Sequence, residues 1–398
     1  MIKKILIFST AYLPLIGGAE VAIKEITDRM GNEDFSARGG PAFIWDMITA
    51  RIKRDLPKFE RLGNINVYRI GLGLGALDKI ILAMFGAFKA RRLDKKNNYD
   101  AIWSIMASQA SIGAAFFKIF NKNKKLILTL QEGDEEEHLA RYVFNIKFLY
   151  KLLVRPWHRL VFKKADKVTA ISNYLKERAI KNGVKAPVEI IPNGVDIRNY
   201  ELRIMNHELN RLKNKLGIKK NDKILITTGR LVKKNAVDDI IRSLTCLDRN
   251  IKFISLGAGP DFDKLKNLAK ETGVDKRVLF LPLVENKDVI KYLKIADIFI
   301  RPSLSEGLGN SFLEAMAAGI PVIGTPVGGI PDFLINNETG FFCEVQNPKS
   351  IAEKVNYILD EKNKEAVLKV KENACRLVAE KYNWDKIAEK MKNIFNIL

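Results

Sequence analysis

Two carboxylates flank a glycine-bearing turn in the segment Ser305-Glu-Gly-Leu-Gly-Asn-Ser-Phe-Leu-Glu314. Glu306 falls in the turn, and Glu314 falls about one turn into the helix that follows. Unpaired backbone N–H groups and the positive end of the dipole at a helix start attract anions such as a diphosphate. A carboxylate repels phosphate but accepts hydrogen bonds from sugar and ribose hydroxyls. The segment therefore predicts a nucleotide-sugar site; the alternative is a capped amphipathic helix with two solvated glutamates.

Strand-like apolar runs alternate with helical patterns along almost the whole chain and would position such a turn. The runs cover residues 4–9, 47–50, 67–70, 101–104, 126–130, 167–171 and 189–191, then 223–228, 252–256, 278–281, 298–302, 322–324 and 340–343. This alternation predicts an α/β protein with two doubly wound, Rossmann-like domains facing a cleft. Ligand is expected at the carboxyl ends of the strands.

The domain boundaries follow from the breaks in this alternation. Residues 198–221 are charged and lack a strand signal, so we expect them to link a domain of residues 1–197 to one of residues 222–383. Residues 36–45 interrupt a short connection, and we interpret them as an inserted surface loop without an assigned function.

Composition excludes some classes of protein. The 398 residues carry a formal net charge of +21 and include three cysteines and three histidines. The cysteines are scattered, as in cytoplasmic proteins, and the histidines show no metal-ligand spacing. No uninterrupted apolar run is long enough for a membrane span. We therefore expect a cytoplasmic protein without a metal or other cofactor.

Several further motifs occur in a fixed order around the acidic segment. They are Gly17-Gly-Ala-Glu20, Ile171-Ser-Asn-Tyr-Leu175, Ile191-Pro-Asn-Gly-Val-Asp196, Thr228-Gly-Arg-Leu-Val-Lys-Lys234, Ser255-Leu-Gly-Ala-Gly-Pro260 and Thr325-Pro-Val-Gly-Gly-Ile-Pro-Asp332. Each motif alone is compatible with an ordinary turn or helix cap. Together they resemble glycosyltransferase family 4, whose members have the GT-B fold and are mostly retaining, metal-independent enzymes. The resemblance covers nearly the full length.

The resemblance implies a role for each matching position. Glu306 would hold donor-sugar hydroxyls near the bond that breaks, and Glu314 would hold the ribose. Arg230, with Lys234 beside it, would neutralise the diphosphate, because a leaving nucleoside diphosphate gains charge as the glycosidic bond breaks. The remaining implied donor contacts are Gly18 on the first domain, Gly257 beside the base, and the backbone of Gly309, Asn310, Ser311 and Phe312. The last segment, residues 384–398, resembles a terminal helix that packs back on the first domain.

Two positions depart from the family pattern. The usual second cation lies five residues after the arginine, where this chain has Asn235. Many relatives have histidine where Gln131 stands, contacting the donor sugar. A glutamine amide can still orient a sugar through hydrogen bonds, but it cannot handle a proton. Arg230, Glu306 and Gln131 are therefore the expected catalytic residues.

A basic amphipathic stretch covers residues 141–168, and a second basic and apolar helix is expected over residues 78–96. Cations interleaved with aromatic side chains suit docking on anionic lipid. The alternative is a core helix with a solvated basic face. No base-reading motif accompanies the charge, so nucleic acid is not an expected partner.

These features predict a retaining hexosyltransferase. It would move a sugar from a nucleotide-diphosphate donor to an acceptor hydroxyl in polysaccharide or glycolipid synthesis, in the cytoplasm or at the inner face of the membrane. Two alternatives stay open. One is a nucleotide-sugar epimerase of the same architecture. The other is a non-catalytic, membrane-associated subunit that binds nucleotide sugars.

Overall fold

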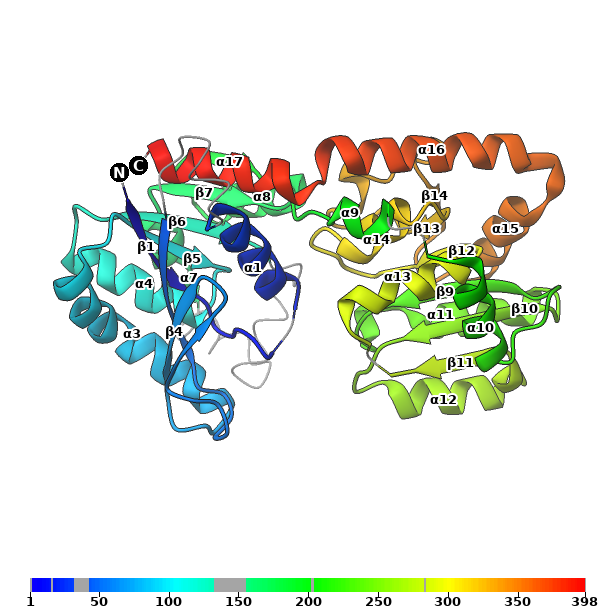
Figure 1. Cartoon of the computed structure of the whole chain (residues 1–398), viewed down its shortest axis with the longest axis horizontal. Helices are drawn as coiled ribbons and strands as arrows, with labels where there is room; N and C mark the ends of the chain where they lie inside the picture. The colour runs from blue at the N-terminus through cyan, green and yellow to red at the C-terminus, as the bar shows by residue number, and fades with distance from the viewer. Residues whose placement is uncertain are drawn as a thin grey trace. The chain divides into compact units, whose positions relative to one another are not determined.

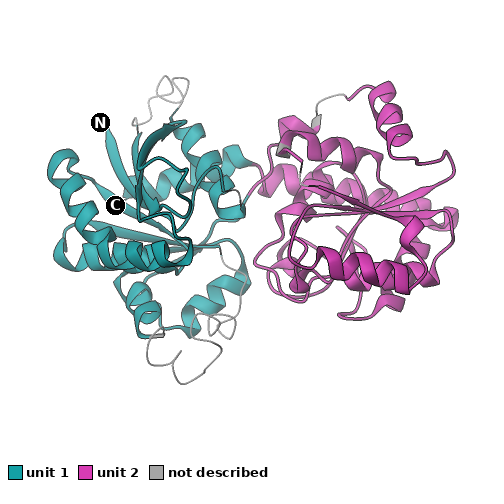
Figure 2. Ribbon diagram, turned by 90° about the horizontal axis from the view of Figure 1, so that it is seen from below, with its two compact units in different colours: residues 1–193, 384–398 teal, residues 194–383 magenta. Residues whose placement is uncertain are grey.

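The computed structural model describes residues 2–15, 17–31, 43–131, 155–201, 204–282 and 284–397. The chain divides into two compact units (Figure 2). Unit 1 comprises Met1–Asn193 and Trp384–Leu398, and unit 2 comprises Gly194–Asn383.

Unit 1 is built on an eight-stranded sheet in the order β3-β4-β2-β1-β5-β6-β7-β8 (Figure 1). Its strands are β1 (Lys3–Phe8), β2 (Phe43–Ala50), β3 (Phe59–Leu62), β4 (Ile65–Ile70), β5 (Ala101–Ile105), β6 (Lys125–Leu130), β7 (Lys167–Ala170) and β8 (Val188–Ile190). All neighbouring strands are parallel except β3 and β4, which are antiparallel. The strand order reverses between β1 and β5, where doubly wound folds bind ligands.

Helices cover both faces of this sheet: α1 (Gly18–Met30), α3 (Ala76–Asn97), α4 (Gln109–Phe120), α7 (Arg155–Lys164), α8 (Asn173–Lys181) and α17 (Trp384–Ile397). Side chains alternate between the faces along each strand. In β1, Ile5 and Ile7 join the core beneath α1 and α17, whereas Leu6 and Phe8 join the core beneath α3 and α4. Both faces are therefore apolar, as the near-continuous strand runs indicate.

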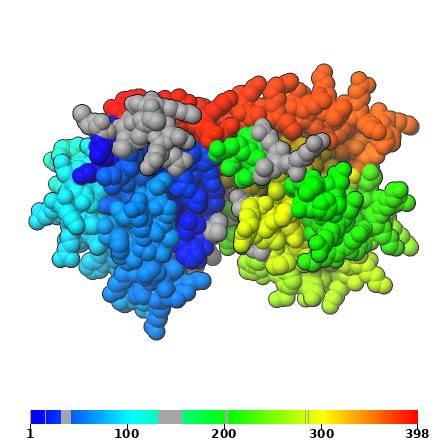
Figure 3. Space-filling view, viewed as in Figure 1, coloured from blue at the N-terminus to red at the C-terminus, as the bar shows by residue number. Residues whose placement is uncertain are grey.

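The C-terminal helix α17 returns to unit 1 and lies at its surface (red in Figure 3). Its Phe395 ring packs edge-on against Trp45 and Trp103, with ring centroids 5.5 and 5.3 Å away. Lys3 Nζ donates to the backbone oxygen of Phe395 at 2.8 Å. Arg29 of α1 donates to Asp385 at 2.6 Å. Apolar packing and polar contacts thus both join the last helix to the first strand and first helix.

Unit 2 has a six-stranded parallel sheet in the order β11-β10-β9-β12-β13-β14. Its strands are β9 (Lys223–Thr228), β10 (Ile251–Leu256), β11 (Val278–Leu281), β12 (Ile298–Arg301), β13 (Val322–Gly324) and β14 (Phe341–Phe342). Its helices are α9 (Ile197–Glu201), α10 (Asn206–Lys215), α11 (Val237–Ser243), α12 (Phe262–Glu271), α13 (Asn286–Ile295), α14 (Asn310–Ala317), α15 (Pro348–Leu359) and α16 (Lys364–Lys381). This is the Rossmann strand order, and it reverses between β9 and β12.

The predicted fold class is confirmed: both units are parallel-sheet α/β domains. The short antiparallel strand β3 was not expected. The predicted inserted loop is wrong at its end, because Phe43 and Trp45 are buried in β2. Residues 36–42 lie outside the described residues. The expected linker, residues 198–221, contains α10 and belongs to unit 2.

Candidate active site

The candidate site lies at the carboxyl ends of β9 and β12, where the strand order of unit 2 reverses. The loop after β9 contains Arg230 and leads through a short 3₁₀ turn, Lys233–Asn235, into α11. The loop after β12 contains Glu306 and leads into α14. The two loops are joined by a backbone hydrogen bond of 2.7 Å from Leu304 N to Lys234 O. The topology therefore brings together loops that are far apart in the sequence, such as those of Arg230 and Glu306, which lie 76 positions apart.

Glu306 is held in place through its own backbone. Its carbonyl oxygen accepts a hydrogen bond from Gly329 N at 3.0 Å. Gly328 has φ +57°, and a Cβ there would overlap the same carbonyl oxygen. A side chain at Gly328 would thus be excluded by both conformation and space. The Thr325–Asp332 motif therefore acts as the support of the acidic loop.

Helix α14 begins next to Glu306 with a glycine as its N-cap. Gly309 has φ +100° and, as a glycine, offers no side chain to cap the helix start. Asn310, Ser311 and Phe312 form its first turn. Phe312 is fully buried against Phe299 and Phe333, with ring centroids 5.1 and 5.6 Å away. This packing fixes the direction of the helix, so the positive end of its dipole has a defined position beside Glu306.

Arg301, the last residue of β12, contacts most parts of this site and was not expected from the sequence. Its Nη2 lies 3.0 Å from Glu306 Oε2 and donates to Asn235 Oδ1 at 2.9 Å. Its Nη1 donates to Ser311 Oγ at 2.7 Å. The sequence signal was a single cation at the end of an otherwise apolar strand run.

The other cations of the site differ in their surroundings. Arg230 is exposed to solvent, and its backbone oxygen accepts a hydrogen bond from Asn235 Nδ2 at 2.6 Å. Lys233 is paired with Asp238 at 2.8 Å. Lys234 is half-buried in the same turn. Arg230 is therefore free to reach an anion at the carboxyl ends of the strands, as its proposed role requires.

Glu314 is half-buried on α14 and has an unusual acidity. Burial raises the pKa of its carboxyl to about 7, while the positive charge of Arg301 acts in the opposite direction. Tyr200 of α9 lies nearby, and its pKa is raised well above the ordinary value by burial and then by the charge of Glu314. Near neutral pH, Glu314 can therefore exist both as an acceptor-only carboxylate and as a protonated acid.

The remaining expected site residues lie at the carboxyl ends of other strands. In unit 2, Gly257 follows β10 with φ +147°, and a Cβ there would overlap the backbone oxygen of Gly229. In unit 1, Gly18 opens α1 after β1. Gln131 directly follows β6, and its Oε1 accepts a hydrogen bond from Asn193 Nδ2 at 3.2 Å. Gly18 and Gln131 thus share one edge of the unit 1 sheet.

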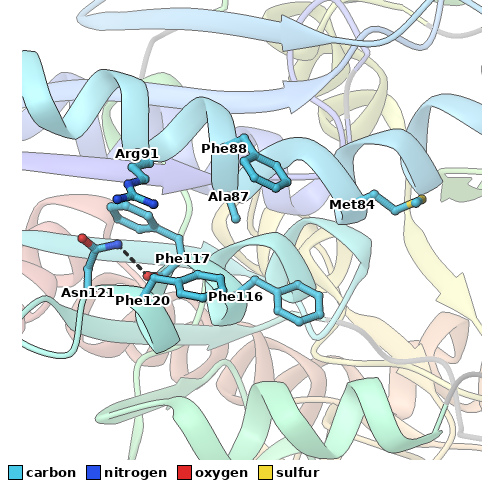
Figure 4. Close-up of a pocket in the computed structure, with 8 residues that line it drawn as sticks. All are labelled: Met84, Ala87, Phe88, Arg91, Phe116, Phe117, Phe120 and Asn121. Atoms are coloured by element: carbon cyan, nitrogen blue, oxygen red, sulfur yellow. Dashed lines mark hydrogen bonds between the residues drawn. The ribbon is translucent and has the colours of Figure 1, made fainter.

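A second feature of unit 1 is an apolar groove of about 300 Å³ between α3 and α4 (Figure 4). The helices approach closely where a Cβ on Gly113 would lie 3.1 Å from Leu82 O. The groove is lined by Met84, Ala87, Phe88, Arg91, Phe116, Phe117, Phe120 and Asn121. Phe88 and Phe120 are 70% and 73% exposed. The groove and these exposed rings together form a contiguous apolar patch on unit 1.

The described helices contain no segment long and apolar enough to cross a membrane. Within the described ranges, no three His, Cys, Asp or Glu side chains gather as metal ligands do.

Two family matches cover most of the chain. Residues 16–199 match the family described as Glycosyltransferase Family 4, and residues 209–376 match Glycosyl transferases group 1. Together these matches identify a glycosyltransferase of the family 4 type. Both matches run through the strands and loops that carry the motifs, so the resemblance in the sequence is confirmed, and the chain is a glycosyltransferase.

Individual family members are similar over long stretches. The chain is 27% identical to an uncharacterized glycosyltransferase of Methanocaldococcus jannaschii over 99% of this chain and 98% of the relative. It is 28% identical to a GDP-mannose-dependent alpha-(1-6)-phosphatidylinositol monomannoside mannosyltransferase of Mycobacterium tuberculosis. This similarity covers 76% of this chain and 77% of the relative. A solved Anabaena protein, in complex with UDP and glucose, has a TM-score of 0.76 at 19% identity over 100% of both chains. That likeness shows the GT-B fold.

Proposed function

We propose that this glycosyltransferase moves a sugar from a nucleotide-diphosphate donor to an acceptor hydroxyl and retains the anomeric configuration. The observation that carries the proposal is the grouping of Glu306, the start of α14 and Arg301 at the switch point of the unit 2 sheet. Carboxylate, helix dipole and cation at one point suit a ligand that joins a sugar to a diphosphate.

The donor contacts follow from this grouping. Backbone N–H groups at Gly309, Asn310 and Ser311 face the diphosphate, and Arg230 adds a mobile positive charge. The expected contact from Phe312 is not part of the proposal, because its N–H donates to Gly309 O at 2.9 Å. Lys234 is a further candidate for the phosphates, and Gly257 lies where the base would enter. Glu314 accepts hydrogen bonds from the ribose, and Glu306 from the donor sugar. The roles of Gly18 and Gln131 in unit 1 stay predictions from the family resemblance.

The chemistry is carried by charge on the leaving group. As the glycosidic bond breaks, the sugar becomes cationic and the nucleoside diphosphate gains negative charge. Fixed donors and cations stabilise that charge at little reorganisation cost, so we propose that the reaction proceeds without a metal ion. No covalent protein nucleophile is part of the proposal.

We further propose that the acceptor is presented at an anionic membrane surface. The Mycobacterium tuberculosis relative is named for a phosphatidylinositol monomannoside acceptor. In this chain, α3 exposes Leu77, Ile80, Met84, Phe85 and Phe88 along one helix, next to the exposed cations Arg91, Arg92, Lys95 and Lys96. This combination matches interfacial helices that bind anionic lipid.

The described part of the second basic stretch adds to the same surface. Helix α7 packs on α4, and the Trp157 ring lies 5.6 Å from Phe116. Arg159, Lys163 and Lys164 of α7 are exposed. Residues 141–154 of the predicted stretch lie outside the described residues. We call this surface the docking face. It consists of the exposed apolar side chains of α3 and α4 with Trp157 of α7, and of the exposed cations of α3 and α7.

Replacing Glu306 with Gln tests the transfer proposal. The amide keeps the shape and can still accept from Arg301, but it removes the negative charge beside the reacting sugar. We expect transfer from the preferred nucleotide sugar to fall about 100-fold or more, as for loss of a fixed electrostatic group in other active sites. Donors are first identified by thermal shift with a panel of nucleotide sugars.

Glu353→Gln is the matched control. Glu353 is exposed on α15, and its substitution removes the same charge from unit 2. It should transfer at the wild-type rate. Unchanged transfer by Glu306→Gln would refute the assigned site. Consumption of donor by the wild type without any acceptor product would favour an epimerase, and donor binding without turnover would favour a binding subunit.

A further inference from the structure

The proposed diphosphate site lacks one cation that the family pattern supplies, and this inference rests on the proposed function. Asn235 stands five residues after Arg230, the position at which the resembled family pattern has its second basic residue. Asn235 is only 4% exposed, and its amide is engaged on both sides. Its Nδ2 donates to Arg230 O at 2.6 Å, and its Oδ1 accepts from Arg301 at 2.9 Å. The Asn235 side chain therefore links Arg230 and Arg301 through hydrogen bonds.

Arg301 reaches this point from the neighbouring strand rather than from the same loop. It ends β12, which pairs directly with β9. Its Nη1 lies 3.5 Å from the Thr228 oxygen at the end of β9 and 2.7 Å from Ser311 Oγ in the first turn of α14. The Arg301 guanidinium thus lies next to both Asn235 and the first turn of α14.

Within the part of the chain that the structure describes, the hydrogen bonds of Arg301 leave one donor without a partner. Its side chain is 13% exposed, and so is that of its ion-pair partner Glu306. Among the described residues, Arg301 Nε has no hydrogen-bond partner, and Glu306 Oε2 takes part in the ion pair without a well-aligned hydrogen bond. Buried charges are normally paired, and a buried polar atom such as Nε normally has at least one hydrogen-bond partner. An anion with several oxygens would complete the set of partners.

We propose that Arg301 is the second cation of the diphosphate site and replaces, from strand β12, the basic residue that Asn235 removes. Its guanidinium binds the β-phosphate oxygens together with the N–H groups of α14. Asn235 and Ser311 hold the guanidinium in position for this contact. Glu306, which pairs with Arg301 in the free protein, is then available to the sugar hydroxyls.

This role differs in its consequences from simple neutralisation of Glu306. A purely structural arginine would affect all nucleotides equally, through the fold of the loop. A cation on the β-phosphate affects nucleoside diphosphates, whereas nucleoside monophosphates lack the group that it binds. Binding of the β-phosphate also depends on where the positive charge lies and not on which residue carries it. A lysine at position 235 should therefore compensate for loss of Arg301.

The experiment uses the full chain and four variants: Arg301→Met, Asn235→Lys, the double variant, and Arg249→Met as control. Arg249 is an exposed cation just before β10, at the amino end of the sheet. Calorimetric titrations with UDP, GDP and ADP, and with the matching monophosphates, give the dissociation constants. Thermal unfolding and circular dichroism check that each variant folds.

Loss of one charge-assisted contact should weaken binding of the preferred nucleoside diphosphate about 10- to 100-fold in Arg301→Met, with the monophosphate changed by less than about twofold. The double variant should recover most of that loss, and Arg249→Met should match the wild type. Equal weakening of both nucleotides, or no recovery in the double variant, would overturn the inference. If the wild type itself binds no nucleoside diphosphate, the proposed function fails instead.

Discussion

At the residue scale, Glu314 is the titrating group of the candidate site. Its pKa of about 7 exceeds the ordinary carboxyl value because burial disfavours the charged form. Between about pH 4.5 and 7, the Glu314 carboxyl is therefore protonated in the folded state and ionised in the unfolded state. The free energy of unfolding contributed by Glu314 falls as pH rises through this window. Above pH 7 the folded state carries the full cost of burying the Glu314 charge.

Glu314→Gln should thus stabilise the protein in a pH-dependent way. At pH 8 we expect the free energy of unfolding to rise by about 1–3 kcal/mol, and at pH 4.5 the difference should disappear. The measurement is urea unfolding of both proteins across this range. A variant that is less stable than the wild type at pH 8 would contradict the assigned acidity.

The same titration should appear in binding. If the carboxylate form holds the ribose, wild-type affinity for a nucleoside diphosphate falls as pH drops from about 8 to 6. Glu314→Gln should bind more weakly at pH 8 and follow only the titration of the phosphate itself. Parallel pH profiles for the two proteins would show that Glu314 does not touch the ribose.

The residues of the site were predictable only where the chain itself carries a local pattern. Glu306 and Glu314 stand in one contiguous motif beside glycines, so their spacing predicted a nucleotide-sugar site, whereas the role of Arg230 was predicted from the resemblance to the family. Arg301 has no such motif, because its contacts depend on β12 lying next to β9. The sequence showed the departure at Asn235 with Lys234 beside it, but not that Arg301 reaches Asn235 from another strand.

At the scale of elements, α17 joins the ends of the chain within unit 1. Phe395 lies among Phe43, Trp45 and Trp103 and is 1% exposed. Removal of a buried aromatic ring leaves a cavity that the surrounding strands cannot fill. The last helix therefore contributes to the stability of the first domain.

Phe395→Ala should lower the free energy of unfolding by about 3–5 kcal/mol. Urea unfolding followed by tryptophan fluorescence reports it, because Trp45 and Trp103 are in contact with the ring. Ile397→Ala on the same helix is the control, since Ile397 is 82% exposed and should be nearly neutral. A loss of less than about 1 kcal/mol in Phe395→Ala would mean that α17 is dispensable for unit 1.

Elements were predictable where burial produces continuous apolar runs, as in β1, β6 and β9. Strand β3 (Phe59–Leu62) was missed because it is a four-residue edge strand with alternating exposed positions. Its pairing comes from the turn at Gly63, which has φ +57°, and not from its own composition. Short edge strands are defined by their partner, and local sequence carries little of that information.

At the scale of the whole molecule, the docking face is an exposed apolar feature that the proposed function has to explain. The loop before α3 exposes Leu72 and Leu74, and the buried Asp78 carboxylate accepts hydrogen bonds from the backbone N–H groups of Leu72, Gly73 and Leu74. The apolar side chains are therefore presented by an ordered loop. A surface of this kind, bordered by cations, suits an anionic bilayer.

Flotation with lipid vesicles tests the docking face. The protein should bind vesicles that contain phosphatidylglycerol, bind pure phosphatidylcholine less, and be released as salt rises. Replacing both Phe85 and Phe88 with Ser should weaken binding about tenfold or more, because two aromatic side chains no longer enter the bilayer. The control replaces the exposed Tyr357 and Leu368 of unit 2 with Ser.

Tryptophan emission gives an independent reading of the same binding. Trp45, Trp103 and Trp384 are buried, whereas Trp157 on α7 is 43% exposed. A shift to shorter wavelength on adding anionic vesicles would therefore report Trp157 entering the bilayer. Equal binding of the double Phe variant and the control would refute the docking face.

The central claim is that the start of α14 binds the diphosphate of a nucleotide sugar. Hydrogen exchange of the full chain, with and without a saturating nucleoside diphosphate, measures this most directly. The amides of residues 307–312 and 229–231 should become protected, since they lie at the carboxyl ends of β12 and β9. Saturating nucleotide that leaves these amides unprotected while protecting others would contradict the claim.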